Sequence, residues 1–527
     1  MAGSYKVLID WNNDGDFTDT HDDVSSDTLS LSWERGRNYA SALLGRSVSG
    51  KLTATLVNTD GKYSPSNTSS ALTGNILPGR TVQLQAGSGS FPYTFPVAFN
   101  DGVRWQGKLE RIVPAPSSVG AKTCTLVAFG TLGYLNQFET QVAGQTDILT
   151  SAAATEDSAI GSILDDLGWP DDTAHRDLDT GITTIPRFWV ACTKGINALR
   201  LVEEAEAGFL KESKTGQVAF ENRYHRLTET ASTTSQATFS DASGSTHSYV
   251  TLAQTDPLTT IINHVEATAR TYDTASIATL WTHPETGAAS PTLAPGEVKT
   301  FVASYPNPDA GNSAEEVDVW TTPAATTDVL LNTSHSGSAG DGGDITSDLT
   351  IAASKTAERM AITLTNGSTS DGFVTLLKAR GTAVNTKNPC LVQAIDTASQ
   401  AIYGERKYVA KTKFIPTTSE AQDWCDYQMA IYGSPIEILT MTISASSPSN
   451  IGQVMLRDLS DRITVTATND AALGINADFF IESERHQVTN GGTDHVATWQ
   501  LSPASGGYSQ FWVLGTSVLG TSTVPAF

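Results

Sequence analysis

The sequence predicts a mainly β, multidomain protein, with antiparallel barrel-like β-domains at both ends, a small α+β domain between them and an inserted β-sandwich. Three observations lead to this class. The chain has 527 residues, more than one hydrophobic core accommodates. Only 17% of the residues are charged and 39% are hydrophobic, while Thr, Ser, Ala and Gly are abundant, which favours short strands and turns. Apolar residues also alternate with period two in several segments.

Residues 1–140 predict the N-terminal β-domain. In segment 50–57, Leu52, Ala54 and Leu56 alternate with polar residues, so one face of this strand is expected to be buried. Turn residues follow at 58–61, because Asn, Asp and Gly accept the backbone geometry of turns. Further strands are expected near 5–9, 29–33, 82–85, 102–112 and 123–129.

Residues 141–226 predict the small α+β domain. Two segments repeat apolar residues at helical spacing: Ile160, Ile163, Leu164 and Leu167, then Ile196, Leu199, Val202 and Ala205. Gly168 and Gly208 end these helices. Segments 209–212 and 218–221 flank a turn at 214–216 and are expected to form a hairpin.

The remaining chain is expected to divide into four parts. Residues 227–280 are expected to form a β segment that belongs with the terminal β-domains. The proline-rich stretch 281–381 is expected to form the inserted β-sandwich. Residues 382–505 predict the C-terminal β-domain with one helix, which starts at a capping box of Ser419 and Gln422 and ends at Gly433. Residues 506–527 are expected to form an extended C-terminal tail.

The charge balance argues against several classes of function. The formal net charge is 33 − 56 = −23, and no cluster of Lys and Arg is present, so docking on a phosphate backbone is not expected.

No stretch resembles a signal peptide or a membrane span, so the protein is expected to be made in a cytoplasm and to leave by lysis or in a particle. Four distant cysteines, Cys124, Cys192, Cys390 and Cys425, are expected to be buried free thiols.

The sharpest local motif is a calcium-loop pattern in segment 10–16. Asp10, Asn12 and Asp14 would supply side-chain oxygens and Asp16 a backbone carbonyl, with glycine at the sixth place. The twelfth place is His21 rather than glutamate, so Asp22 or Asp23 would have to complete a Ca²⁺ site. The alternative is a turn without metal, because a turn requires the same residue types.

No motif of an enzyme is present. The nine histidines have no zinc spacing, and no nucleophile elbow or phosphate-binding loop occurs. Acidic pairs at 165–166, 171–172 and 203–204 resemble glycosidase carboxylates in composition, but helical spacing favours a solvated helix face. Nine of the ten tryptophans are interpreted as core residues rather than as a sugar-binding surface: Trp33, Trp105, Trp169, Trp189, Trp281, Trp320, Trp424, Trp499 and Trp512.

Several segments, in serial order, resemble one family. Segment 45–65, which ends in Asp60-Gly61-Lys62-Tyr63-Ser64-Pro65, is similar to the opening domain of bacteriophage minor tail proteins. The similarity continues through 77–82, 105–110, 198–199, 203–209, 216–222, 403–406, 461–465 and 512–515, and so covers most of the chain. The chain therefore resembles the tail-tip baseplate hubs of tailed phages and related injection machines.

This resemblance implies a non-enzymatic structural protein of the virion, at the distal tail tip. It implies a homotrimer whose first and last β-domains alternate in a pseudo-sixfold ring. Expected partners are distal tail and tail-tube proteins, the tape measure protein and a central fibre or spike, with DNA only as passing cargo. An acidic channel wall would let DNA slide without binding.

Two other functions remain open. The inserted sandwich at 281–381 and the tryptophans are compatible with a host-surface, carbohydrate-binding tail adhesin. A cell-wall hydrolase is the third alternative, although no recognisable nucleophile, metal triad or paired-carboxylate context supports it.

Overall fold

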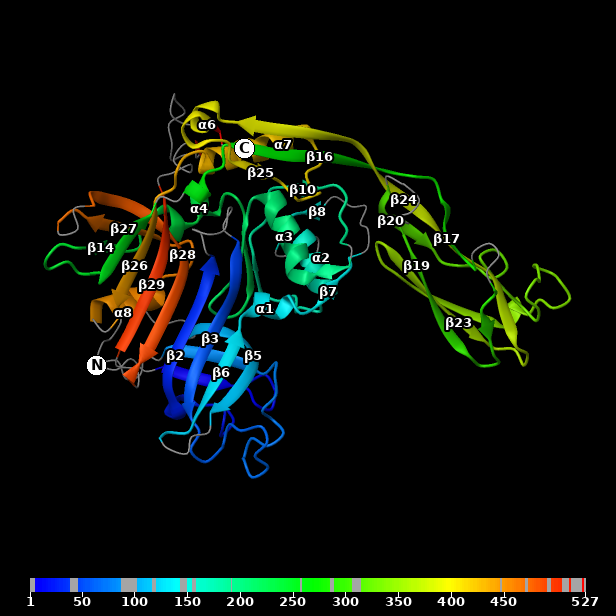
Figure 1. The fold of residues 1–527 in the computed structure, drawn as a ribbon, viewed down its shortest axis with the longest axis horizontal. Coiled ribbons are helices and arrows are strands. Elements are labelled where there is room, and N and C mark those ends of the chain that lie inside the picture. The colour runs from blue at the N-terminus through cyan, green and yellow to red at the C-terminus, as the bar shows by residue number, and fades with distance from the viewer. Residues whose placement is uncertain are drawn as a thin grey trace.

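A computed structural model describes residues 5–37, 46–86, 102–115, 120–142, 149–153, 158–190, 192–255, 258–284, 289–305, 314–445, 448–469, 473–490, 494–504, 511–512 and 524–525. The chain is mainly β and multidomain, with several antiparallel sheets, which confirms the predicted fold class. Its largest sheet has twelve strands and runs through both ends of the chain (Figure 1).

The first half of that sheet is the N-terminal β-domain. Its strands lie in the order β1-β4-β5-β6-β3-β2. They are β1 (Tyr5–Ile9), β2 (Thr28–Arg37), β3 (Ser47–Val57), β4 (Thr81–Ala86), β5 (Val103–Ala115) and β6 (Thr123–Phe129). The alternation predicted in 50–57 is found in β3, where Leu52, Ala54 and Leu56 are fully buried.

The second half is the C-terminal β-domain, which also has six strands. They are β14 (Thr238–Ser240), β15 (Thr251–Thr255), β26 (Ile438–Ser444), β27 (Arg462–Ala467), β28 (Ile475–Thr489) and β29 (Asp494–Pro503). Helix α8 (Pro448–Leu456) contributes Ile451, Val454 and Met455 to the core. Strand β28 pairs with β2, so one hydrophobic core continues through both domains.

The small α+β domain lies against these two β-domains (Figure 1). Its helices are α1 (Thr131–Leu135), α2 (Ala159–Asp166), α3 (Gly195–Glu206), α4 (His225–Thr228) and α5 (Thr230–Thr233). Its short strands are β7 (Glu139–Thr140), β8 (Leu149–Thr150), β9 (Arg176–Leu178), β10 (Thr184–Ile185), β11 (Thr193–Lys194), β12 (Phe209–Glu212) and β13 (Val218–Glu221). The predicted apolar stripes of α2 and α3 face each other in its core.

The insertion is carried on two long strands, β16 (His264–Thr274) and β24 (Gly372–Ile395), which pair with each other. Around them lie β17 (Ala278–His283), β18 (Thr292–Leu293), β20 (Ala314–Thr321), β21 (Val329–Asn332) and β25 (Lys407–Val409). A second sheet contains β19 (Val298–Ser304), β23 (Arg359–Asn366) and β22 (Leu349–Lys355). The two sheets enclose a separate core, and the sandwich projects away from the twelve-stranded sheet (Figure 1).

Several expected segments differ from the structure. Strands β16 and β17 belong to the sheet of the insertion, so only part of 227–280 joins the twelve-stranded sheet. Residues 382–395 continue β24 of the insertion. The expected single helix of 382–505 is one of three described there: α6 (Thr397–Tyr403), α7 (Thr418–Tyr432) and α8. Helix α7 is capped by Thr417, which accepts from the Glu420 amide, and not by Ser419.

One structural unit occurs twice. The 3₁₀ turn η1 (Ser25–Asp27) lies between β1 and β2, and η4 (Thr346–Asp348) lies between β21 and β22. The amide of Val7 donates to the Ser25 hydroxyl over 3.0 Å, and the amide of Leu331 donates to the Thr346 hydroxyl over 2.9 Å. In both places a hydroxyl of the turn thus accepts from an amide of the strand that precedes it.

Four other expectations concern single residues and the ends of the chain. Cys124 and Cys425 are buried free thiols as expected, whereas Cys192 and Cys390 are exposed. Of the expected core tryptophans, six are buried: Trp33, Trp105, Trp189, Trp320, Trp424 and Trp499. Most of the expected tail at 506–527 lies outside the described residues, within which β30 (Phe511–Trp512) pairs with β31 (Val524–Pro525). Within the described residues, no helix is long and apolar enough to cross a membrane.

Candidate functional site: a charged junction between the β-domains

The two β-domains meet along a ladder between β2 and β28. The pairing extends from Leu31 opposite Val488 to Gly36 opposite Ser483. Gly36 adopts φ +109°, and a Cβ atom at this position would lie 2.4 Å from the carbonyl oxygen of Glu482. Glycine is therefore required here both by the left-handed backbone and by the close approach of β28.

Buried ion pairs cross this ladder. The Nε atom of Arg35 lies 2.6 Å from a carboxylate oxygen of Glu484, and its Nη2 atom lies 2.5 Å from Asp458. The Arg35 side chain is buried and also donates to the Glu212 carbonyl oxygen. Arg35 thus connects the two β-domains with the α+β domain, because Glu212 ends β12.

A second set of buried ion pairs lies two residues further along β2 and β28, around Glu482. Glu482 accepts from Arg37 over 2.5 Å and from Arg226 over 2.7 Å. Burial alone would raise the pKa of Glu482, but the two guanidinium groups hold it well below its usual value. Removing one partner of such a buried pair leaves an uncompensated charge and costs roughly 3–5 kcal/mol.

The hairpin of β12 and β13 contacts both β-domains and so holds the α+β domain against them. The ammonium group of Lys214 donates to the last carbonyl groups of α8, including that of Met455 at 3.1 Å, where a cation is favoured by the helix dipole. On the other side, the Glu212 carboxylate accepts from the amides of Gly50 and Leu132 at the start of α1. Burial raises the pKa of Glu212 to about 7.

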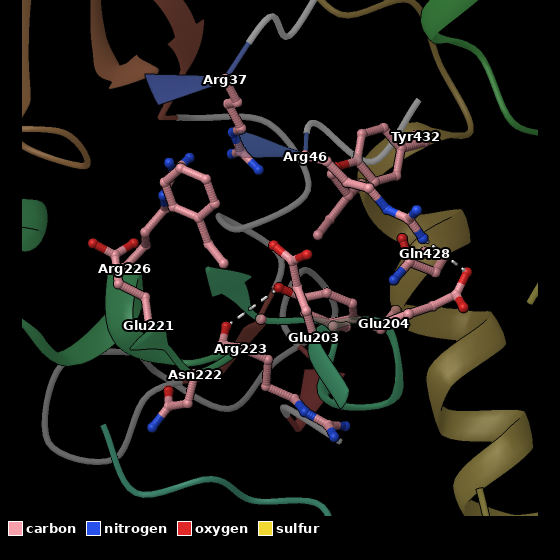
Figure 2. Close-up of a pocket in the computed structure, with 15 residues that line it drawn as sticks. Arg37, Arg46, Glu203, Glu204, Glu221, Asn222, Arg223, Arg226, Gln428 and Tyr432 are labelled. Carbon is pink, nitrogen blue, oxygen red and sulfur yellow. Dashed lines mark hydrogen bonds and ion pairs between the residues drawn. The ribbon is translucent and has the colours of Figure 1, made fainter. Parts of the chain in front are cut away.

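Figure 2 shows a pocket of about 60 Å³ beside these pairs, at which four arginines and three glutamates converge. They are Arg37, Arg46, Arg223, Arg226, Glu203, Glu204 and Glu221. Lys211 pairs with Glu221 and lowers its pKa, although burial alone would raise it. The amide of Leu210 donates to Glu203 over 2.8 Å.

The expectation of a solvated face at 203–204 is wrong. Glu203 and Glu204 are both buried, because the end of α3 lies between the hairpin and segment 408–411. Glu204 accepts from the Tyr408 hydroxyl and from the Lys411 amide, and Glu206 accepts from the Thr183 amide over 2.7 Å. These carboxylates hold backbone segments together, and helical period alone could not show it, because the segments come from distant parts of the chain.

The calcium-loop residues lie together at one end of the N-terminal β-domain. The buried Asp10 carboxylate accepts from the amides of Asn13 and Gly15, over 2.5 and 3.1 Å. Asn12 donates to Asp14, while Asp22 is buried and accepts from the Asp19 amide over 3.1 Å. Burial raises the pKa of Asp22.

These contacts give the loop the geometry of an Asx turn. Asp16 accepts from the amide and the hydroxyl of Thr18, both over 2.9 Å. No group of three or more His, Cys, Asp or Glu suited to a metal occurs in the described part of the chain. The Ca²⁺ site stays a prediction. Heat of binding at about millimolar Ca²⁺ that disappears in Asp14→Asn would support it, and its absence in the unaltered chain would exclude it.

The Asp-Gly-Lys-Tyr-Ser-Pro motif packs against this loop. Tyr63 is fully buried, its ring lies 6.3 Å from that of Trp11, and its hydroxyl donates to Asp27 over 2.5 Å. Its amide donates to Asn58. The motif therefore holds the long connection between β3 and β4 against the core.

No protein-family model and no curated protein matches this sequence. Among solved structures, the chain is similar to the tail protein of Neisseria meningitidis MC58, with 10% identity, a TM-score of 0.48 and coverage of 95% of this chain and 97% of that one. A 43 kDa tail protein of prophage MuSo2 from Shewanella oneidensis has 9% identity and a TM-score of 0.45, over 96% and 98% of the two chains. An E. coli component of the type VI secretion system, described as structurally similar to T4 tail proteins, has 7% identity and a TM-score of 0.37, over 90% and 73%. The first two of these structures are described as tail proteins, and the third as a secretion-system component that is similar to T4 tail proteins.

Proposed function

We propose that this chain is a non-enzymatic structural protein of a virion, the hub at the distal tip of a tail. It would join the tail tube to a central fibre or spike and surround the channel through which DNA leaves. The observation that carries this proposal is the joining of two six-stranded β-domains side by side through β2 and β28. Three copies around one axis would present six β-domains, which suits a hexameric tube above and a threefold spike below.

A free strand edge supports a ring. Strand β15 pairs with β26, and no second partner of β15 occurs among the described residues. At the opposite end of the sheet, β1 is covered by segment 22–24 through the pairs Ile9–Asp22 and Val24–Val7. A free edge strand is a template for pairing, so β15 is where a neighbouring copy would complete the ring.

The proposed partners follow from this position. They are two further copies of the chain, distal tail and tail-tube proteins, the tape measure protein, and the fibre or spike. DNA would pass as cargo, and the net charge of −23 would reduce its adhesion if carboxylates line the channel. A structure of the assembled ring tests this point, because a neutral or basic channel wall would contradict it.

Immunogold labelling of intact particles tests the proposed location. Antibody raised against the purified chain should place gold at the distal tail tip alone. Gold along fibres, or none on particles, would contradict the hub. Light scattering of the purified chain should give the mass of three copies, and a monomer at all concentrations would contradict the proposed ring.

A host-surface adhesin is the second candidate, favoured by one observation. The inserted sandwich projects from the rest of the chain on β16 and β24 (Figure 1), as a module that meets a cell surface would. A glycan array probed with the full chain should show binding that is lost when 275–383 are removed. Silence across the array would leave the hub function alone.

A further inference from the structure

A cavity of about 280 Å³ lies where the insertion joins the α+β domain. Three segments far apart in the sequence form its walls: 185–187 at the end of β10, 270–272 in β16, and 413–416. The amide of Arg270 donates to the Ile415 carbonyl over 2.9 Å, which fixes two of these walls to each other. The volume is close to the lower limit of small-molecule sites, roughly 300 Å³.

The walls carry an excess of positive charge in a chain with net charge −23. Arg187, Arg270 and Lys413 line the cavity, and no carboxylate does so among the described residues. Arg187 pairs with Asp318 over 2.5 Å, and the Lys413 ammonium lies 3.8 Å from the centre of the Trp189 ring. The Arg270 guanidinium has no hydrogen-bond or ion-pair partner within the described part of the chain, so it is available to a ligand.

The rest of the lining is apolar and firmly held. Tyr272 and Phe414 contribute aromatic rings, and Pro186 and Pro416 contribute restricted backbone. The Tyr272 hydroxyl donates to the Lys413 carbonyl over 2.8 Å. Flat apolar walls beside cations are suited to a ligand with a ring-sized body and one anionic group.

Two fully buried polar groups beside this cavity lack hydrogen-bond partners within the described residues. One is the indole N–H of Trp189, whose ring packs against Tyr272 at 4.8 Å. The other is the carboxyl group of Glu316, whose nearest cations include Lys413 and Arg187. Burial raises the pKa of Glu316 to about 9, so at neutral pH it is protonated and does not neutralise these cations. Unsatisfied buried donors are rare in native proteins, and an acceptor or ordered water at this place would satisfy them.

We propose that this cavity binds a compact organic anion, a single carboxylate or phosphate group on a ring-sized body. Arg270 donates to the anionic group, as guanidinium groups do with carboxylates and phosphates, while Lys413 adds attraction. Tyr272 and Phe414 pack against the body of the ligand. The proposal does not depend on the hub function, because it concerns the single chain.

Titration calorimetry of the full chain tests the proposal with three probes. Glucuronate carries a carboxylate, glucose 6-phosphate carries a phosphate on the same ring-sized body, and glucose is uncharged. We expect binding of at least one anionic probe, weakened by added salt, and no binding of glucose. The stronger of the two anionic probes identifies the source of the anionic group. Equal binding of glucose, or no binding of any probe, would overturn the proposal.

A pair of variants locates the site. Arg270→Gln removes the guanidinium in the cavity, and Arg485→Gln removes an arginine that is 72% exposed on β28. A lost hydrogen bond to a charged group corresponds to a loss of affinity of about tenfold or more, which we expect for Arg270→Gln alone. Equal affinities in the two variants would overturn the assignment. Unfolding curves of both variants check that the fold is retained.

Discussion

Gly36 illustrates how single residues allow the two β-domains to join. At Gly36 the backbone has a left-handed φ of +109°, which strains any other residue. A Cβ atom there would also lie 2.4 Å from the backbone of β28. Gly74 has a similar φ of +82°, but nothing lies within 4 Å of its Cβ position. Comparison of the two positions therefore separates backbone strain from the close approach of strands.

We expect Gly36→Ala to lower the free energy of unfolding more than Gly74→Ala. A left-handed non-glycine residue costs roughly 1–3 kcal/mol, and Gly36→Ala adds displacement of β28 to that cost. Urea unfolding of both variants measures the difference. Equal destabilisation would show that the β2–β28 ladder tolerates a side chain here.

Two buried histidines lie in the same region. The hydroxyl of Tyr5 lies 2.9 Å from Nδ1 of His495, whose Nε2 lies 3.0 Å from Nδ1 of His486. The His486 ring stacks on Trp33 at 4.3 Å, and its Nε2 is 3.6 Å from Glu484. Burial lowers the pKa of His486, and that of His495 falls well below its usual 6.5. The two histidines are thus buried in their neutral form beside the ladder between β2 and β28.

The sign of the pH effect follows from these pKa values. The unfolded chain protonates both histidines below about pH 6.5 and the folded chain does not. Their contribution is therefore complete above that pH and is lost as the pH falls. Glu203 and Glu212 act in the opposite direction, because burial raises their pKa values to about 7, and they stabilise the fold as the pH falls. His225 acts in the same direction as these glutamates. Its burial would lower its pKa, but Asp179 and Glu221 raise it.

We expect the double variant His486→Gln, His495→Gln to lose less stability between about pH 7 and pH 5 than the unaltered chain. Both proteins keep Glu203, Glu212 and His225, so those contributions cancel in the comparison. Melting temperatures across this range provide the measurement. Parallel curves for the two proteins would show that the histidine pair does not determine the acid response.

At the scale of elements, the β12–β13 hairpin holds the α+β domain to the C-terminal β-domain through the contact of Lys214 with α8. Lys214→Met keeps most of the side-chain volume but removes the donor from three carbonyl groups. We expect a loss of roughly 1–3 kcal/mol in the free energy of unfolding. Lys51→Met on an exposed position of β3 is the matched control, and an equal change in both would contradict the role of the hairpin.

The sequence predicted elements better than their contacts. Local period identified β3, α2, α3 and the hairpin, because each depends on neighbours within a few residues. The pairing of β2 with β28 joins residues about 450 positions apart, and nothing local in Trp33 or Gly36 indicates it. The burial of Glu203 and Glu204 was missed for the same reason, since their hydrogen-bond partners lie in distant segments.

At the scale of the whole molecule, the insertion is separable from the rest. Its core around Val374 and Ile362 is distinct from the core that β16 forms with α7 around Ala267 and Trp424. The two sets of side chains are connected through β16 and β24, where Thr274 pairs with Val384. The chain could therefore be shortened at this pair without opening either the twelve-stranded sheet or the core beneath α7.

We expect a variant in which an Asn-Gly turn joins Thr274 directly to Val384 to fold and to keep the oligomeric mass of the full chain. An Asn-Gly turn suits two antiparallel strands at this register, and residues 275–383 contribute no strand to the twelve-stranded sheet. Light scattering and circular dichroism of the shortened and full chains provide the measurement. A shortened chain that folds but loses its oligomeric mass would place the subunit contacts in the insertion and contradict the ring of β-domains. A shortened chain with the mass of three copies would assign assembly to the β-domains and leave the projecting sandwich for contacts outside the ring.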